Sequence, residues 1–308
     1  MGQGRDTPPD GASARSDRVL PSATSEHPAL RDRPRSQPEV EQRTTGSTTA
    51  TAAPQQDPVL TEEVRPGILL SRPTRPGRLD SMNTELIQRL RDALAEVRDD
   101  AGIRAIVLTG NGRAFCAGLD LNGHGEPLGT RGVEGAPQAG LRPQKHIAAV
   151  NGFALGGGTE IVLACDLAVI DETASLGLPE VRRGLLTAAG GVIRLQRQVP
   201  FKIAAEIALT GESINAERAL ELGLVNRVAE GDLARRGAPA GGDHRRERPL
   251  SARETRRVIH ESVAAGSDWD KGPWKVSNEA MKKVFASEDA KEGARAFAEK
   301  RAPVWTGK

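Results

Sequence analysis

Asn151-Gly152-Phe153-Ala154-Leu155-Gly156-Gly157-Gly158-Thr159-Glu160 is the stretch on which the fold assignment depends. It follows an apolar, strand-like run and leads into a second apolar run that we expect to form a buried helix. If that helix begins near Gly157, its first N–H groups have no intrahelical acceptor and the helix dipole adds positive potential there. Such a helix end can hold a negatively charged oxygen, with Glu160 beside it. A glycine-rich turn followed by a dipole-matched glutamate explains the same residues without any chemistry.

The composition excludes several classes of protein. With 308 residues, 37% of them hydrophobic, the chain can form one large domain or two small ones, and part of it is expected to stay unpacked. A net charge of +2 is too small to indicate a nucleic-acid partner. Cys116 and Cys165 show neither metal spacing nor a disulfide framework, so we expect a cytoplasmic protein without a bound metal. Because no apolar run reaches about 18 residues and the start lacks an apolar signal core, we expect no membrane partner.

The chain changes character along its length. Residues 1–57 are rich in Pro, Ser, Thr and Arg without any period, which predicts a disordered extension. Residues 58–228 alternate strand-like and helix-like runs, which indicates an α/β core. Residues 229–249 form an irregular segment rich in Gly, Arg and Pro, and helical periodicity resumes over residues 250–308.

Apolar periodicity predicts the elements of the core. The clearest helix places Leu86, Ile87, Leu90, Leu94 and Val97 on one face, with Ser81 or Asn83 as its N-cap. Further expected elements are helices over 188–195, 203–209 and 215–222, strands over 67–70, 104–110, 146–150, 166–170, 174–178 and 223–228, and a terminal helix pair. The two prolines in 72–78 argue against a central strand there. No glycine signature of a nucleotide-binding doubly wound sheet is present.

Several motifs, in order along the chain, resemble the enoyl-CoA hydratase/isomerase (crotonase) superfamily. They span residues 114–121, 147–166, 177–184, 221–226 and 292–301, and the resemblance covers about residues 58–228 and 250–308. It implies an α/β fold: a crotonase-like spiral of ββα units with a C-terminal helical trimerisation region, and trimers that commonly pair into hexamers. It also implies an acyl-CoA substrate, so that coenzyme A is part of the substrate and no separate cofactor is expected.

The resemblance also assigns a site. Two backbone N–H groups, those of Leu119 and Gly157, would hold the thioester oxygen of the acyl-CoA, and hydratases of the family carry glutamates at both positions matched by Glu160 and Glu180. Hydration must deliver hydroxide to C3 and a proton to C2 of an enoyl thioester, so one carboxylate can act on water while the other donates a proton. By resemblance, Glu160 is the base and Glu180 the acid. Which of them is protonated at rest stays open, and Glu180 after Pro179 can also be a solvated turn residue.

Five further residues are expected at the substrate. Phe297 and Lys300, three apart on the terminal helix, would reach the nucleotide end of coenzyme A in a neighbouring subunit, although a core Phe and a solvated Lys are an equal alternative. Ala117 would face the adenine and Arg78 a phosphate. Asp120 lies in the same loop as Leu119 and is expected to fix that loop rather than perform chemistry.

Three stretches depart from the family pattern. Residues 71–80 carry an extra proline, and Asp80 stands where the usual Arg-Pro-x-x-x-Asn-Ser-Met motif has Asn. Residues 122–144 and 230–249 replace an expected loop and an expected helix, as an out-of-frame translation would. The family also includes isomerases, specialised hydroxyacyl-CoA dehydratases and inactive relatives, which remain alternatives to a hydratase. A non-catalytic or RNA-binding relative would need a Lys-rich helical face, and the sequence shows no strong one. The acyl-chain length cannot be read from the sequence.

Overall fold

The computed structural model describes residues 57–100, 102–120, 144–231, 233 and 249–306. The chain divides into two units, 1–52 and 53–308, and all described residues lie in the second unit. The predicted extension up to residue 56, and most of the atypical segments 122–144 and 230–249, therefore lie outside the described residues.

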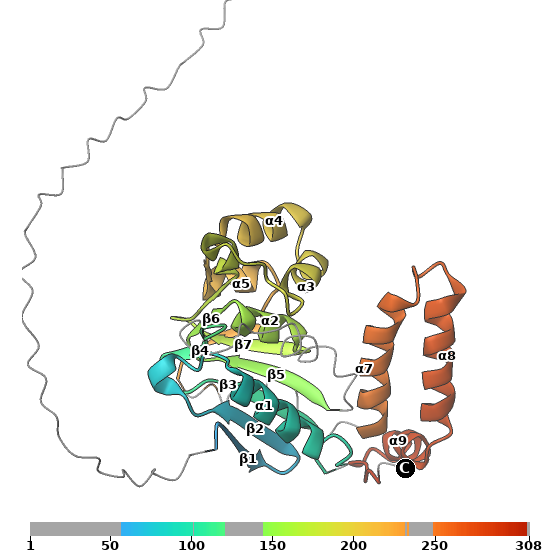
Figure 1. The fold of residues 1–308 in the computed structure, drawn as a ribbon. Helices are drawn as coiled ribbons and strands as arrows, with labels where there is room; N and C mark the ends of the chain where they lie inside the picture. The colour runs from blue at the N-terminus through green and yellow to red at the C-terminus, as the bar shows by residue number, and fades with distance from the viewer. Residues whose placement is uncertain (1–56, 101, 121–143, 232, 234–248, 307–308) are drawn as a thin grey trace, which may run out of the picture. The chain divides into compact units, whose positions relative to one another are not determined.

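Two sheets form the framework, and Figure 1 shows their strands stacked on one another, with the yellow helices above them and the orange and red C-terminal helices to the right. The larger sheet has the order β1-β2-β3-β5-β7-β10. Its strands are β1 (Val59–Arg65), β2 (Ile68–Pro73), β3 (Ala105–Thr109), β5 (Lys145–Val150), β7 (Leu167–Asp171) and β10 (Arg227–Ala229). β1 and β2 are antiparallel and the remaining neighbours are parallel. Parallel strands are buried on both faces, and all five residues of β3 are buried.

The smaller sheet has the order β4-β6-β8-β9. Its strands are β4 (Ala114–Cys116), β6 (Phe153–Leu155), β8 (Ser175–Gly177) and β9 (Ile214–Asn215). The pairs β3–β4, β5–β6 and β7–β8 each begin in the large sheet and continue into the small one. β6 is followed by a helix and β8 by a 3-10 turn, so consecutive units wind as the predicted ββα spiral.

The helices follow the predicted apolar periodicity closely. Asn83, one of the two predicted N-caps, accepts a hydrogen bond from the N–H of Leu86 at 2.9 Å and starts α1. The helices are α1 (Thr84–Glu96), α2 (Gly157–Ala164), α3 (Gly191–Gln198), α4 (Phe201–Thr210), α5 (Ala216–Glu221), α7 (Pro249–Ala264), α8 (Lys271–Phe285) and α9 (Glu288–Ala298), with 3-10 turns η1 (Pro76–Arg78) and η3 (Pro179–Arg183). The main hydrophobic core combines side chains of both sheets with those of α2 to α5.

Two further predictions about elements are confirmed. The expected terminal helix pair is α8 and α9, and α7 precedes it in the region where helical periodicity was expected to resume. The two prolines were expected to exclude a central strand over residues 72–78, and β2, which lies between β1 and β3, ends at Pro73. The ladder to β3 already stops at Ser71, and Pro73 is paired with Val59 of β1, so the N–H that proline lacks is not needed by β3.

An ionic cluster at Asp166 connects α7 to the short segment between α2 and β7. The Asp166 carboxylate accepts hydrogen bonds from Nε of Arg256 at 2.7 Å and from the N–H of His146 at 2.8 Å, and it lies 2.8 Å from Nε2 of His260. Burial raises the pKa of Asp166, but the hydrogen bonds from His260 and Arg256 outweigh it and lower the pKa to about 2. α7 and α8 run side by side (Figure 1). Among the helices of the described ranges, none has the length and apolar character needed to cross a membrane.

Candidate active site

The glycine run produces the helix start that the sequence predicted. Gly156 is the N-cap of α2, with φ +54° and ψ −119°, a conformation that favours glycine. Its N–H donates to the carbonyl of Gly177 in β8 at 2.8 Å, and the Thr159 hydroxyl donates to the carbonyl of Ala154 in β6 at 2.6 Å. Gly157 is therefore the first helical residue, held between two strands, and its N–H has no intrahelical acceptor.

The second predicted amide lies in the loop after β4. Leu119 forms a parallel bridge with Met82, in which the N–H of Met82 donates to the carbonyl of Gly118 at 2.8 Å and the N–H of Asp120 donates to the carbonyl of Met82 at 2.9 Å. Because the neighbours of Leu119 make these two bonds, the N–H of Leu119 itself faces away from Met82. Neither this N–H nor that of Gly157 donates to a backbone carbonyl elsewhere in the described part of the chain.

The two amide-bearing segments abut. Gly118 has φ +91°, and a methyl group placed on its Cα would lie 2.9 Å from the carbonyl oxygen of Leu155 and 3.6 Å from the nitrogen of Gly157. Any side chain at Gly118 would separate the loop from the start of α2. The approach of Leu119 to Gly157 therefore depends on glycine at this position.

Glu160 is buried in the first turn of α2, 6% exposed. Its Oε1 accepts a hydrogen bond from the N–H of Gly191 at the start of α3, at 2.8 Å. Burial raises the pKa of Glu160, and the negative charge of Glu180 raises it further. Hydrogen bonds from the N–H groups of Gly191 and Ala189, together with the charge of Arg194, lower the pKa. The net result is still a raised pKa. Glu160 therefore lies within electrostatic reach of the second predicted acid.

Glu180 approaches the same place from η3, which follows β8. A methyl group placed on Cα of Gly156 would lie 2.8 Å from Oε1 of Glu180 and 3.7 Å from Cα of Gly118. Glu180 is only partly exposed, and its Oε2 is buried without a hydrogen-bond partner among the described residues. A buried carboxylate oxygen without a partner is costly to the fold, which marks it as available to a ligand.

The structure thus brings together both predicted acids and both predicted amides. Glu160 and Glu180 come from different ββα units, and the starts of α2 and of the Leu119 loop lie beside Glu180. Two carboxyl groups near a pair of outward-facing N–H groups can move protons on and off a substrate whose carbonyl oxygen gains negative charge.

Two supporting residues were missed in the sequence. Arg194 in α3 is half-buried, donates to the carbonyl of Ala189 at 3.0 Å, and contributes positive charge at Glu160. Asn151, the first residue of the decisive stretch, accepts from the N–H of Gly110 at 2.8 Å and donates to the carbonyl of Ala114 at 3.1 Å. A polar residue directly after the apolar run 147–150 was the available signal for Asn151, because such a residue often closes a turn.

The residues predicted to bind coenzyme A do not gather in one place as the predicted acids and amides do. Arg78 is exposed in η1, and the N–H of Ala117 donates to the carbonyl of Leu79 at 3.1 Å. Asp120 forms an ion pair with Arg75 at 2.9 Å. This contact agrees with the expectation that Asp120 fixes its loop. Phe297 is 88% exposed, so the alternative of a core phenylalanine is wrong. Lys300 lies beyond the end of α9 with φ +54°, so it does not share a helical face with Phe297 as predicted.

The described part of the chain contains two histidines and two cysteines, and none of them is among the predicted site residues. His260 lies on α7 and contacts Asp166, as described above. Cys116 is a buried filler, and burial raises the pKa of its thiol to about 12. In the described ranges, no three His, Cys, Asp or Glu side chains gather as a metal site would require.

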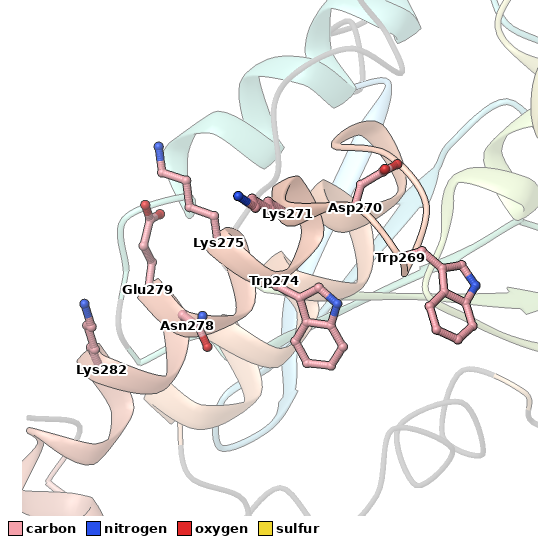
Figure 2. Close-up of a pocket in the computed structure, with 8 residues that line it drawn as sticks. All are labelled: Trp269, Asp270, Lys271, Trp274, Lys275, Asn278, Glu279 and Lys282. Carbon is pink, nitrogen blue, oxygen red and sulfur yellow. The ribbon is translucent and has the colours of Figure 1, made fainter.

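A hollow of about 610 Å³ lies on the first half of α8 and the turn before it, and none of the predicted site residues lines it. Figure 2 shows the indole rings of Trp269 and Trp274 projecting outward there. Trp269 is 91% exposed and Trp274 59%, and the hollow is also lined by Lys271, Lys275 and Lys282 of α8.

Comparison with known proteins identifies similar chains over most of the length. The sequence profile of the family described as enoyl-CoA hydratase/isomerase matches residues 63–308. The chain is 35% identical over 251 residues to the 2,3-dehydroadipyl-CoA hydratase of Escherichia coli K12, covering 78% of this chain and 96% of that protein. It is likewise 35% identical to the enoyl-CoA hydratase EchA19 of Mycobacterium tuberculosis, covering 78% and 94%. Among solved structures, the enoyl-CoA hydratase EchA1 of Mycobacterium marinum superposes with a TM-score of 0.75 at 40% identity, covering 82% of this chain and all of that one.

Proposed function

Since the chain belongs to the enoyl-CoA hydratase/isomerase (crotonase) family, we propose that it is a hydro-lyase that adds water reversibly to a trans-2-enoyl-CoA, giving a 3-hydroxyacyl-CoA. The family and the fold agree with the resemblance drawn from the sequence motifs. The relatives named above support a hydratase over an isomerase, because each carries a hydratase name.

The observation that carries the proposal is the convergence of Glu160 and Glu180. A double-bond isomerisation moves one proton between two carbons and can be served by one carboxyl group, whereas hydration must handle water at C3 and a proton at C2. Two carboxyl groups within electrostatic reach, beside the start of α2, meet that requirement.

In the proposed reaction, Glu160 removes a proton from water as the water oxygen bonds to C3. The electrons of the C2–C3 double bond move to C2 and the thioester oxygen, which the N–H groups of Leu119 and Gly157 hold. C2 then takes a proton from Glu180, so that water has been added across the bond. The N–H of Gly191 keeps Oε1 of Glu160 oriented and favours its ionised form. One oxyanion donor of this kind is typically worth about 3–4 kcal/mol at the transition state.

No electron is gained or lost in this reaction, so we propose no cofactor besides the coenzyme A that the substrate carries. We place Ala117 and Arg78 toward its nucleotide, and Phe297 and Lys300 of a neighbouring subunit at its far end. We also propose a cytoplasmic location, which the lack of metal spacing or a disulfide framework at Cys116 and Cys165 supports.

We also propose a homotrimer, or a hexamer of two trimers, built by the C-terminal helices. Large apolar side chains of this region are exposed in the single chain, which supports an interface: Ile259, Val263, Trp269, Trp274, Met281 and Phe285. Exposed apolar groups gathered on neighbouring elements commonly mark surfaces that a partner covers.

The test of the activity is a spectrophotometric assay with crotonyl-CoA. Loss of the conjugated enoyl absorbance on adding purified protein is the expected result, and a series of longer enoyl-CoAs then gives the chain-length preference. An isomerase would instead act on a 3-enoyl-CoA and create the conjugated absorbance. Protein that leaves crotonyl-CoA and every longer enoyl-CoA unchanged contradicts the proposal.

A further inference from the structure

We propose that Arg75 and Asp120 are positioning residues of the oxyanion site, whose ion pair fixes the loop that carries the Leu119 N–H relative to Gly157. The inference rests on the proposed function, because it concerns the same thioester oxygen. It gives the loop-fixing role expected of Asp120 a partner, Arg75 in the turn that precedes α1, and it connects that role to the oxyanion site.

The Arg75 guanidinium joins two segments that are far apart in sequence. Its Nη2 donates to Oδ2 of Asp120 at 2.9 Å, and its Nη1 donates to the carbonyl of Ser81 at 2.5 Å. The Arg75 side chain is 23% exposed and that of Asp120 only 7%, so this pair is shielded from water far more than most surface pairs are. Asp120 directly follows Leu119, so the ion pair acts one residue away from the amide in question.

The turn that carries Arg75 is itself pinned. Leu79 and Asp80 have φ of +53° and +51°, a conformation that costs non-glycine residues on the order of 1 kcal/mol each. The fully buried Asp80 carboxylate compensates by accepting from the N–H of Arg75 at 2.9 Å and from the N–H of Asn111 at 2.5 Å. Because Asn111 follows β3, Arg75 is anchored to the large sheet rather than to a free loop.

Met82, at the end of the same turn, touches both halves of the site. Its backbone bonds to Gly118 and Asp120 on either side of Leu119, and its terminal methyl group packs on the face of Gly157 where any side chain would clash with it. The turn therefore holds Leu119 through its backbone and through Arg75–Asp120, and it holds Gly157 through Met82. Breaking the ion pair removes the restraint that Arg75 places on the Leu119 loop, whereas the contact between Met82 and Gly157 remains.

The expected consequence is a loss in turnover rather than in substrate binding. The affinity for an acyl-CoA comes largely from contacts along its nucleotide, whereas the two amides act most strongly when charge develops on the thioester oxygen. A shift of one amide by about 1 Å is enough to lower a rate by up to about a hundredfold. We therefore expect the kcat to fall and the KM to stay nearly constant.

The experiment uses Arg75→Met, Asp120→Asn and the double variant to break the ion pair. Arg75→Lys is the conservative variant, and Arg218→Met is the matched control. Arg218 also forms an ion pair, with Glu221 at 2.8 Å, but on the exposed surface of α5. Each single variant should lower the kcat for crotonyl-CoA by about tenfold or more with KM changed less than about threefold. The double variant should be no worse than either single one, because both remove the same pair. Arg75→Lys should keep part of the rate, and Arg218→Met all of it.

A second readout does not depend on hydration. Acetoacetyl-CoA forms an enolate that absorbs in the near ultraviolet, and an intact oxyanion site should stabilise it on binding, whereas butyryl-CoA reports ground-state binding alone. The variants should lose affinity for acetoacetyl-CoA selectively. If wild type shows the enolate band and the variants lose it, the inference stands even where no enoyl-CoA is hydrated. Two results for the variants would overturn the inference about Arg75 and Asp120: an unchanged kcat and enolate affinity, or an equal loss of affinity for both ligands. Either result leaves the hydratase proposal intact. A wild-type protein that shows no enolate band also overturns the inference.

Discussion

The helix α2 and the helix α8 are both regular, yet they relate to the rest of the chain in opposite ways. In α2, buried residues are Gly157, Gly158, Thr159, Glu160, Val162 and Leu163 out of eight, and its first turn is enclosed by strands of the small sheet. In α8, Ala280 is the buried residue out of fifteen, and Trp274, Met281 and Phe285 are exposed. Polar groups are buried in α2 and apolar groups are exposed in α8, each against its ordinary preference.

This difference shows that the two helices lack different kinds of contact in the single chain. α2 buries an acid and an unsatisfied helix start, which costs stability that a substrate or a transition state can recover. α8 exposes apolar surface, which another copy of the chain can cover in the proposed oligomer. The first feature predicts chemistry and the second predicts assembly, so substitutions in the two regions should change different measurements.

The largest expected effect tests the chemistry at α2. Glu160→Gln and Glu180→Gln should each lower the kcat for crotonyl-CoA by about 10²–10⁴-fold, because an amide cannot move a proton as a carboxyl group does. Titration with butyryl-CoA should show nearly unchanged binding, since neither side chain is needed for the nucleotide contacts. Activity retained in both variants would contradict the assignment of these acids.

The next effect tests assembly at α8. Trp269→Ser and Trp274→Ser should lower the oligomer mass measured by light scattering, because a buried interface tryptophan commonly contributes about 2 kcal/mol or more. Leu60→Ser is the matched control, since Leu60 is 40% exposed in β1, away from the C-terminal helices. An unchanged oligomer in both tryptophan variants would show that this face is not the interface.

A smaller effect tests the ionic cluster at Asp166, which connects the segment after α2 to α7. The pKa of Asp166 lies at about 2, below its usual 3.8, because the hydrogen bonds from His260 and Arg256 outweigh the burial of the carboxyl group. A lowered pKa gives stability that is present above pH 3.8 and lost as the pH falls toward about 2. Asp166→Asn should therefore lower the free energy of unfolding at neutral pH by about 2 kcal/mol, and this difference should shrink in acid.

Urea unfolding at several pH values measures this difference. Glu288→Gln is the control, because Glu288 pairs with Lys291 on the exposed surface of α9 and such pairs contribute little. A difference between Asp166→Asn and wild type that is as large at pH 2 as at pH 7 would show that charge is not the cause.

The sequence predicted the parts of this molecule that follow from local pattern. The start of α2, the Asn83 cap and the alternation of strands and helices are all encoded within a few neighbouring residues. Glu160 and Glu180 were matched by motif, but their approach depends on how β6 and β8 pair, which no local pattern states. Arg194 and the Arg75–Asp120 pair were missed for the same reason, because their partners are contributed by other elements. Lys300 was misplaced because spacing alone cannot show where a helix ends.

The smallest effect returns to α2 and separates activity from stability. Burial raises the pKa of Glu160 above its usual 4.5, so the native state loses stability as the pH rises from about that value through the raised pKa. Glu160→Gln removes this loss and can still accept the hydrogen bond from Gly191. The variant should melt about 2–4 °C above wild type near pH 8, as a gain of about 1 kcal/mol would produce, and the difference should nearly vanish near pH 4. Glu217→Gln, at an exposed position in α5, should show no such pH dependence. A Glu160→Gln variant that is inactive and also less stable than wild type at pH 8 would mean that this acid supports the fold, and the contrast between α2 and α8 would lose its basis.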